Sequence, residues 1–366
     1  MTTDEDTYAG RKGALPDIAA PDLSYQPPLP KRPLTIGMIG TGGISGSHLD
    51  AYRTAGWTVA KMWNRTKVTA EDRAAEFAPD AIVVDDWHDI LNDPSIDVVD
   101  ITPHPDVRLP IIEAAIRAGK HVLSQKPFVT GLDTGARLVA LADDHGLKLA
   151  VNQNGRWAPH LAWMREAVRA GHIGTLQSCH CNCHWDHNWT MGTSFEDVPS
   201  LILYDYAIHW CDFLTSVAGD RIKSVLATET RATGQDPRVP LLAQMLVRLD
   251  GGQASLIFDG AARFGGRDTT LITGTDGTLQ SGGPDLGEQA LTLTTAKGSA
   301  APVLHGTWFN DGFRGAMGEL MCAVEEDRDP LHSARGNLAS LALCFAAITS
   351  ARNGGEVAVG SVRSLP

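Results

Sequence analysis

The feature that most constrains this chain is a glycine-rich turn between a short apolar run and a helical stretch. Residues 34–40 read Leu-Thr-Ile-Gly-Met-Ile-Gly, and Thr-Gly-Gly-Ile-Ser completes the segment to position 45. In such a segment the first glycine permits a tight turn and the second lets the backbone approach a pyrophosphate, whose charge then meets a helix N-terminus. A plain glycine-rich turn would read the same. The strand before it and the helix after it favour a dinucleotide site, with contacts from Gly40, Gly42, Gly43, Ile44 and Ser45.

Strands alternate with helices from residue 34 to residue 153. Strands are expected at 34–39, 57–63, 81–84, 98–102, 121–124 and 147–152, with helices at 48–55, 68–77, 87–92, 109–118 and 134–145. This alternation predicts a doubly wound parallel sheet of the Rossmann type, so residues 34–153 are interpreted as a nucleotide-binding domain.

The pattern changes in residues 154–366, where strands follow one another without helices between them. Strands are expected at 176–184, 223–230, 244–249, 253–259 and 269–274, and helices at 159–170, 201–217, 316–326 and 337–351. Gly251-Gly252 is typical of a hairpin turn. The pattern predicts an α+β substrate domain with an open, mostly antiparallel sheet, whose exposed face is expected to contact another subunit.

The first 33 residues contain six prolines and little periodic apolar pattern. Such a segment cannot offset its ordering entropy alone, which predicts a flexible arm. An extended arm that packs on a neighbouring subunit fits the same residues.

Charge and composition exclude several partners. A net charge of −12 argues against nucleic acid and anionic membranes. The longest apolar stretch, 338–348, is too short to span a bilayer. The acidic start lacks the order of a secretory leader, and six cysteines without one suggest free thiols, so a cytoplasmic protein is expected.

The end of the second expected strand bears on the choice of cofactor. It reads Asn64-Arg65-Thr66-Lys67, without the carboxylate that holds the ribose 2′-hydroxyl of NAD. The missing carboxylate favours NADP, whose 2′-phosphate an arginine accommodates. Because Asn64 could also bind a free hydroxyl and Arg65 could stack on adenine, both NAD and NADP remain open.

Two further segments carry candidate catalytic groups. Lys126 and Pro127 follow the strand 121–124, at the sheet edge where ligands bind, and a lysine there can hold a substrate hydroxyl. Asp205, His209 and Asp212 share one face of the expected helix, and a histidine beside a carboxylate can accept the proton of an alcohol. A surface lysine and a satisfied core histidine are the structural alternatives.

Taken together, these motifs resemble the glucose–fructose oxidoreductase, inositol dehydrogenase and rhizopine-catabolism (Gfo/Idh/MocA) family over about residues 34–350. The segments that carry the resemblance are 40–45, 96–103, 118–127, 154–159 and 205–212. The resemblance implies that Lys126 holds the substrate, that Asp205 binds it and that His209 is the general acid/base. It also implies a cis bond before Pro127, an Arg156 that reaches towards substrate or cofactor, and a homodimer or homotetramer. Further cofactor contacts would come from Thr102, Pro103, His104, Gln125 and Asn154.

The chain departs from the family pattern near the nicotinamide half of the expected cofactor. Gln125 replaces the glutamate that usually precedes Lys-Pro, the loop at 103–106 is one residue longer, and Arg108 stands where a histidine is frequent. These departures bear on the identity of the substrate more than on the type of reaction.

The segment 179–187 alternates cysteines with polar residues and then becomes aromatic. On a strand the three cysteines would lie on one face, and ligands spread in this way do not converge on a metal, so no metal site is expected. Trp185, His187 and Trp189 follow. Aromatic faces stack on sugars and histidines bond hydroxyls, so these three residues could line a substrate pocket; a packed loop at a subunit contact is the alternative.

The sequence thus predicts an NAD(P)-dependent oxidoreductase that transfers a hydride between nicotinamide and a sugar or polyol carbon. Two alternatives remain. One is glycoside cleavage through transient oxidation, which would produce no net reduced cofactor. The other is a cofactor-sensing protein without turnover, which would not need Lys126, Asp205 and His209 together.

Overall fold

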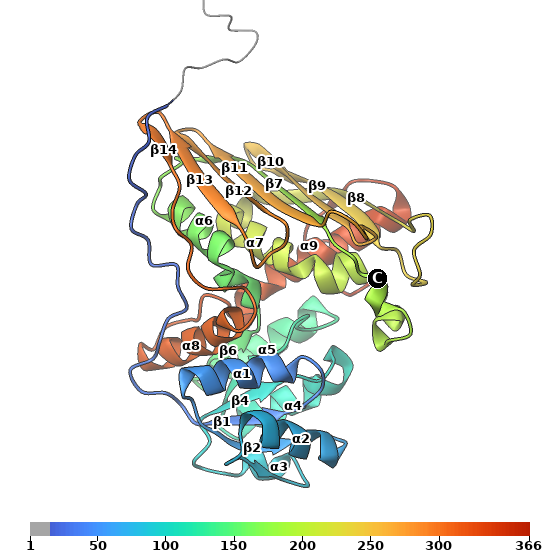
Figure 1. Ribbon diagram of the computed structural model, residues 1–366. Coiled ribbons are helices and arrows are strands. Elements are labelled where there is room, and N and C mark those ends of the chain that lie inside the picture. The colour runs from blue at the N-terminus through green and yellow to red at the C-terminus, as the bar shows by residue number, and fades with distance from the viewer. Residues whose placement is uncertain (1–14) are drawn as a thin grey trace, which may run out of the picture.

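The computed structural model describes residues 15–366 and contains two sheets (Figure 1). The first sheet has six parallel strands in the order β3-β2-β1-β4-β5-β6. These strands are β1 (Ile36–Ile39), β2 (Val59–Trp63), β3 (Ile82–Val83), β4 (Val98–Ile101), β5 (His121–Ser124) and β6 (Leu149–Val151). The order changes direction between β1 and β4, and ligands bind at such a switch point in open α/β sheets.

Helices cover both faces of this sheet, so its strands are apolar on both sides. Neighbouring residues of β4 illustrate this, because Val98 belongs to one apolar cluster and Val99 to the other. The connecting helices are α1 (Ser45–Ala55), α2 (Lys67–Phe77), α3 (His88–Leu91), α4 (Pro105–Arg117) and α5 (Leu132–Asp144). Helix α4 begins four residues earlier than the apolar pattern indicates, because Pro105 occupies its first turn, where proline is tolerated.

The second sheet has nine strands in the order β14-β13-β12-β11-β7-β10-β9-β8-β15. Only the pair β7 and β10 is parallel, so the sheet is mostly antiparallel, as predicted. Gly251 lies in the turn between β9 and β10 with a φ of 68°, which confirms the expected hairpin. The five strands that the sequence indicated are β7 (Leu176–His184), β8 (Ile222–Thr230), β9 (Leu242–Leu249), β10 (Gly252–Asp259) and β11 (Arg267–Gly274).

Four further strands of this sheet were not predicted from the sequence. They are β12 (Gly277–Gly283), β13 (Ala290–Thr295), β14 (Gly298–Ala300) and β15 (Val357–Ala358). Glycines weaken a local strand preference, and β12 begins and ends with them. Pairing with β11 and β13 supplies the stability that local propensity lacks.

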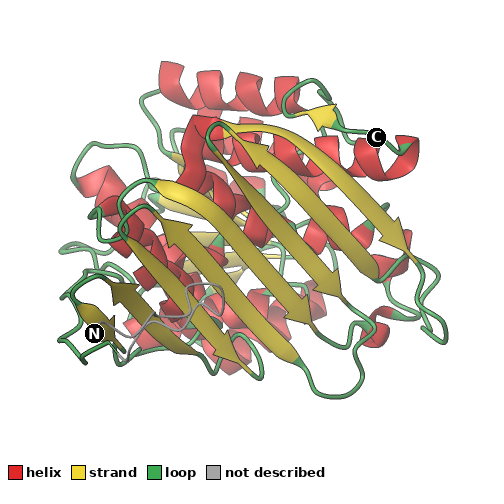
Figure 2. Ribbon diagram, turned by 90° about the horizontal axis from the view of Figure 1, so that it is seen from above, coloured by secondary structure: helices red, strands yellow, loops and turns green. Residues whose placement is uncertain are grey.

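Helices cover one face of the second sheet and leave the other open. Helices α6 (Pro159–Arg169), α7 (Ile208–Ala218) and α9 (Ala334–Asn353) lie under the strands, and Figure 2 shows the uncovered face in front of them. Strand β9 alternates accordingly, with Met245 fully buried and Leu246 57% exposed. Within residues 15–366, no helix is both long and apolar enough to cross a membrane.

Helix α8 (Asp311–Glu325) joins the two halves of the molecule. It comes from the C-terminal half of the chain, yet Phe313, Met317 and Leu320 pack with Met38 and Val98 of the first sheet. The helix begins five residues before the expected start at 316.

The arm is only partly described, because residues 1–14 lie outside the described part of the chain. From residue 15 the arm runs as an extended segment along its own chain (Figure 1), and its flexibility stays a prediction. Asp17 pairs with Ser299, and the hydroxyl of the buried Tyr25 accepts a hydrogen bond from the backbone N–H of His305 at 2.8 Å.

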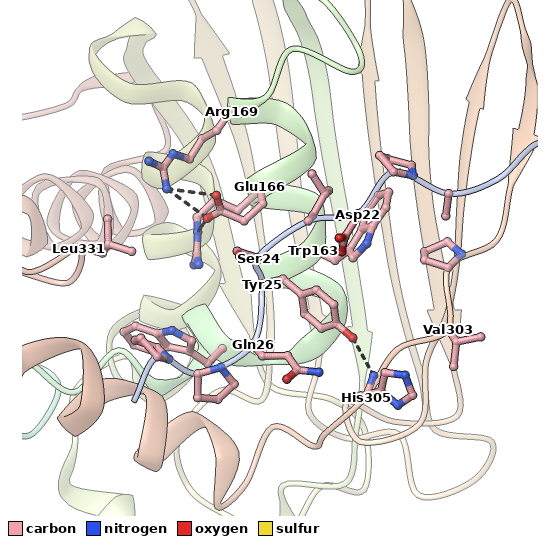
Figure 3. Close-up of a pocket in the computed structure, with 18 of the residues that line it drawn as sticks. Asp22, Ser24, Tyr25, Gln26, Trp163, Glu166, Arg169, Val303, His305 and Leu331 are labelled. Carbon is pink, nitrogen blue, oxygen red and sulfur yellow. Dashed lines mark hydrogen bonds and ion pairs between the residues drawn. The ribbon is translucent and has the colours of Figure 1, made fainter. Parts of the chain in front are cut away.

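A cavity of about 830 Å³ lies between the arm and α6. Figure 3 shows Glu166 and Arg169, both in α6, pointing toward one another in the wall of this cavity. The Arg169 guanidinium lies 3.1 Å from Oε1 of Glu166. These charges therefore already have partners inside the chain.

Candidate active site

The glycine-rich turn lies at the carboxyl edge of the first sheet. Gly40 follows β1 with a φ of 95°, a conformation that favours glycine. A Cβ at this position would lie 2.5 Å from Oγ1 of Thr102 and 2.8 Å from Cδ of Pro103. Thr102 in turn donates its hydroxyl to the carbonyl of Gly40 at 2.9 Å. The ends of β1 and β4 are thus held together, and only glycine fits between them.

The space above the next two glycines is open. A Cβ at Gly42 or Gly43 would meet nothing within 4 Å, and Ile44 leads directly into α1. The buried Ser45 donates its hydroxyl to the carbonyl of Gly42 at 2.6 Å. Free space beside the N-terminus of an eleven-residue helix suits a pyrophosphate, so these residues fit the dinucleotide that the sequence predicts.

The residues that bear on cofactor choice lie at the end of β2. Asn64 accepts a hydrogen bond from the backbone N–H of Thr41 at 3.1 Å and donates to the carbonyl of Thr66 at 3.1 Å. Its amide therefore holds the turn. Arg65 is exposed and has no ion-pair partner in the described part of the chain.

Lys126 meets Asp205 between the two sheets. The ammonium of Lys126 donates to Oδ2 and to the carbonyl of Asp205, both at 2.9 Å, and each side chain is about one-fifth exposed (18% and 21%). The peptide bond between Lys126 and Pro127 is cis, as the resemblance implied. Because Lys126 follows β5 and Asp205 precedes α7, the pair draws on both halves of the chain.

The sequence predicted one regular helix over residues 201–217. The segment that carries Asp205 is not regular. Residues Ile202–Tyr206 form a π-helical turn in which the N–H of Ala207 donates to the carbonyl of Ile202 at 2.7 Å, and α7 begins only at Ile208. Such turns occur frequently at functional sites.

Two histidines lie close enough to Lys126 for its charge to affect them. Burial, and then the charge of Lys126, lower the pKa of His209 well below its usual value, and its Nδ1 has no hydrogen-bond partner in the described chain. Burial lowers the pKa of His187 to about 4, opposed by the charges of Asp205 and Asp186. Both imidazoles are therefore neutral at pH 7.

Aromatic rings surround these histidines. The ring of His209 lies 5.3 Å from that of Trp308, and the ring of His187 lies 4.4 Å from that of Tyr206. Trp185 lies 5.3 Å from Tyr206. Of the three aromatic-segment residues that the sequence singled out, Trp185 and His187 belong to this shell. Trp189 is 59% exposed and contacts His187 and Phe195 at the periphery.

Arg156 pairs with a carboxylate of α7, and its role towards substrate or cofactor stays a prediction. It forms a two-pronged ion pair with Asp212, at 2.6 and 2.9 Å, and also donates to the carbonyl of Leu331. In this arrangement it ties the turn Asn154–Trp157 to α7 rather than reaching towards Lys126. The neighbouring Gly155 lies against the site, since a Cβ there would be 3.5 Å from Nδ1 of His209.

A buried hydrogen-bond network contacts the backbone N–H of Lys126. Gln125 accepts hydrogen bonds from the N–H of Lys126 at 2.9 Å and from the amide of Asn152 at 3.0 Å. Asn152 lies 3.1 Å from His48, whose other ring nitrogen is 2.7 Å from Asp100. No motif in the sequence indicated this network. The one hint was Asp100, because an aspartate inside the otherwise apolar strand β4 needs hydrogen-bond partners.

Arg108 was noted only as a departure from the family, and the structure gives it a definite place. It is 1% exposed and donates to the carbonyls of Gln125 and Pro127, on either side of Lys126. Burial lowers the pKa of Arg108 to about 9, so the guanidinium stays charged at pH 7.

The remaining predicted cofactor contacts lie along the same edge of the sheet or close to it. His104 is exposed and precedes α4, while Asn154 is buried and its Oδ1 has no hydrogen-bond partner among residues 15–366.

The three cysteines of β7 lie on one buried face of the strand, as predicted. Cys179, Cys181 and Cys183 are at most 1% exposed, and Cys183 lies 2.9 Å from a carboxylate oxygen of Asp268. Within the described residues, no group of three or more His, Cys, Asp or Glu side chains is arranged to hold a metal ion.

Comparisons with known proteins agree on one family. Residues 34–153 match the oxidoreductase family with an NAD-binding Rossmann fold, and residues 161–280 match the GFO/IDH/MocA C-terminal domain. Inositol 2-dehydrogenase 3 of Saccharopolyspora erythraea is 26% identical over 88% of this chain and 95% of its own length. An uncharacterized protein of Saccharomyces cerevisiae is 28% identical, but the chain spans only about half (56%) of that relative.

Solved structures share the fold. An oxidoreductase from Agrobacterium radiobacter in complex with NAD⁺, L-tartaric acid and magnesium superposes with a TM-score of 0.79 at 20% identity, covering 90% of this chain and 99% of the other. Levoglucosan dehydrogenase in complex with NADH and levoglucosan gives 0.76 at 20% identity, covering 90% and 100%. On the two family matches, which together span more than half of its length, the chain belongs to the GFO/IDH/MocA family of NAD-binding oxidoreductases.

Proposed function

We propose that this protein is an NAD(P)-dependent dehydrogenase that oxidises a hydroxyl-bearing carbon of a sugar, polyol or sugar derivative. The observation that carries the proposal is the meeting of Lys126 with Asp205 beside two neutral histidines at the carboxyl edge of the nucleotide-binding sheet. Relatives named as inositol and levoglucosan dehydrogenases support the substrate class.

The proposed chemistry assigns a role to each of these side chains. Lys126 donates a hydrogen bond to the reacting hydroxyl oxygen and stabilises the negative charge that develops there. Asp205 holds the ammonium in place. His209, neutral at pH 7, accepts the hydroxyl proton. The nicotinamide, when bound, supplies the acceptor for the hydride.

Both NAD and NADP are compatible with this chain, and we propose a preference for NADP. Asn64 already uses its amide to hold the turn, whereas the exposed Arg65 is available for a 2′-phosphate.

The test is the appearance of reduced nicotinamide absorbance with each cofactor against a panel of aldoses, inositols and glycosides. Lys126→Ala and His209→Ala should each lower kcat by about 10²–10⁴-fold while cofactor binding, measured by fluorescence titration, is retained. Near-normal turnover in either variant would remove that residue from the mechanism. Bond cleavage in a glycoside without net reduction of the cofactor would replace the proposal by the glycoside-cleaving alternative.

A further inference from the structure

A second cavity, of about 460 Å³, opens beside the proposed active site. Gly266 and three segments form its wall: residues 184–186 at the end of β7, residues 284–287 between β12 and β13, and residues 307–309 before α8. Its volume falls in the range of small-molecule sites.

Two tryptophans belong both to this cavity and to the shell of the catalytic groups. Trp308 lines the cavity, and its ring lies 5.3 Å from that of His209. Trp185 also lines it, and its ring lies 6.0 Å from that of His187. The two indole rings are 6.5 Å apart. The cavity therefore borders the aromatic residues that surround His209 and His187.

The lining combines flat apolar surfaces with acidic groups. Its apolar lining includes Trp185, Leu286, Trp308 and Phe309; Leu286 and Trp308 are only 4% exposed, whereas Phe309 is 54% exposed. Aromatic faces of this kind stack on the C–H surface of a sugar ring, as the sequence analysis argued for Trp185.

The acidic groups are Asp186 and Asp285, and each uses only one oxygen within the chain. Oδ1 of Asp186 accepts from the backbone N–H of Asn188 at 2.9 Å, and Oδ1 of Asp285 accepts from that of Gly287 at 2.7 Å. Across residues 15–366, Oδ2 of neither aspartate has a hydrogen-bond partner. Carboxylate oxygens accept hydrogen bonds from hydroxyls, which a purely aromatic or aliphatic ligand would not offer.

We infer that this cavity is a subsite for the second ring of a glycoside, whose first ring is oxidised at Lys126 and His209. The inference rests on the proposed function and narrows its substrate class from free sugars to sugars in glycosidic linkage. In the reaction one C–H and one O–H bond of the first ring break. A bound NAD(P), held at the glycine-rich turn, would accept the hydride, the proton would pass to His209, and a carbonyl would form. The glycosidic bond stays intact.

The test begins with a sugar that the panel shows to be oxidised. Its methyl glycoside, its phenyl glycoside and a disaccharide with this sugar at the non-reducing end are then compared by kcat/KM. We expect the disaccharide to exceed the methyl glycoside at least tenfold. Phe309→Ala should lower this disaccharide-to-methyl ratio at least fivefold. Phe309→Leu retains an apolar contact with Phe313 but lacks the stacking face, and should also lower it.

Phe264→Ala is the matched control, because Phe264 is 92% exposed and does not line the cavity. It should leave the ratio unchanged. Equal kcat/KM values for the disaccharide and the methyl glycoside, or a ratio unaffected by both Phe309 variants, would overturn the subsite while the dehydrogenase stands. A gain confined to the phenyl glycoside would overturn the assignment to a second sugar. Absence of turnover with every compound would instead reject the proposed function, and the subsite with it.

Discussion

Replacing Arg108 by methionine tests whether a buried guanidinium sets the position of Lys126. Arg108 donates to the carbonyls of Gln125 and Pro127, the two residues that flank the lysine. The lysine side chain then projects from this fixed backbone to Asp205, 2.9 Å away. Methionine keeps much of the side-chain volume and removes both hydrogen bonds.

The expected magnitude has two parts. Hydrogen bonds from a charged donor contribute about 1.5–3 kcal/mol each, and removal of a buried charge returns part of that loss. We therefore expect Arg108→Met to lower the free energy of unfolding by about 2–4 kcal/mol. A displacement of about 1 Å in a group that contacts substrate can reduce the rate about 10²-fold, so kcat should fall by about that factor.

Urea unfolding measures the first part and steady-state kinetics the second. Arg108→Lys keeps the charge but loses the planar fork, and should fall between wild type and Arg108→Met in both measurements. A merely structural role would lower stability and leave kcat of the folded fraction unchanged. The positioning role is therefore refuted if Arg108→Met, folded under assay conditions, turns over within twofold of wild type.

Three further outcomes are expected. Arg65→Ala should lower the ratio of kcat/KM with NADP to that with NAD about tenfold, roughly 1.4 kcal/mol, whereas Arg117→Ala, at the exposed end of α4, should not; an unchanged ratio would separate Arg65 from the 2′-phosphate. Burial lowers the pKa of His187 to about 4, so the unfolded state binds a proton below pH 6.5 that the folded state does not, and stability falls as the pH falls. Between pH 7 and pH 5 His187 should account for about 2 kcal/mol of the loss in the free energy of unfolding. Urea unfolding at the two pH values should show a loss smaller by this amount in His187→Gln. An equal loss in wild type and His187→Gln would contradict the assignment. Leu246→Lys on the open sheet face should shift a homodimer or homotetramer towards smaller species in light scattering, whereas Val303→Lys on an exposed loop should not; a monomeric wild type would remove the proposed interface.

Elements with strong local patterns were predictable from the sequence. The strands β5 and β7 have the expected bounds, 121–124 and 176–184, because one contains the fully buried pair Val122 and Leu123 and the other alternates with period two. The π-helical turn at Ile202–Tyr206 was not predictable in this way. No local motif marks the one extra residue of a π turn, although this residue changes the direction of Asp205 relative to α7.

Residues that join the proposed site through long-range contacts could not be predicted from the sequence, for a different reason. Trp308 belongs to a segment without a repeating pattern, and it reaches His209 only because the chain returns to the site before α8. Arg108 was visible as an unusual residue, but its partners are backbone carbonyls, which carry no sequence information. Lys126, Asp205 and His209 could be proposed from the sequence because their motifs are local.

The position of Lys126 relative to Asp205 depends on how the two halves of the chain are joined, since Lys126 follows β5 of the first sheet and Asp205 lies in the turn before α7. Helix α8 fixes this junction: Phe313 and Met317 pack on the first sheet, and Gly312 lies so close to Asn154 that a Cβ there would be 2.6 Å from its carbonyl oxygen. Opening the cleft by a hinge would expose this apolar contact at a cost of about 25 cal/mol per Å². We therefore expect substrate to enter past the loops around Phe309 and Leu286, which already border the cavity, while the ion pair between Lys126 and Asp205 stays assembled.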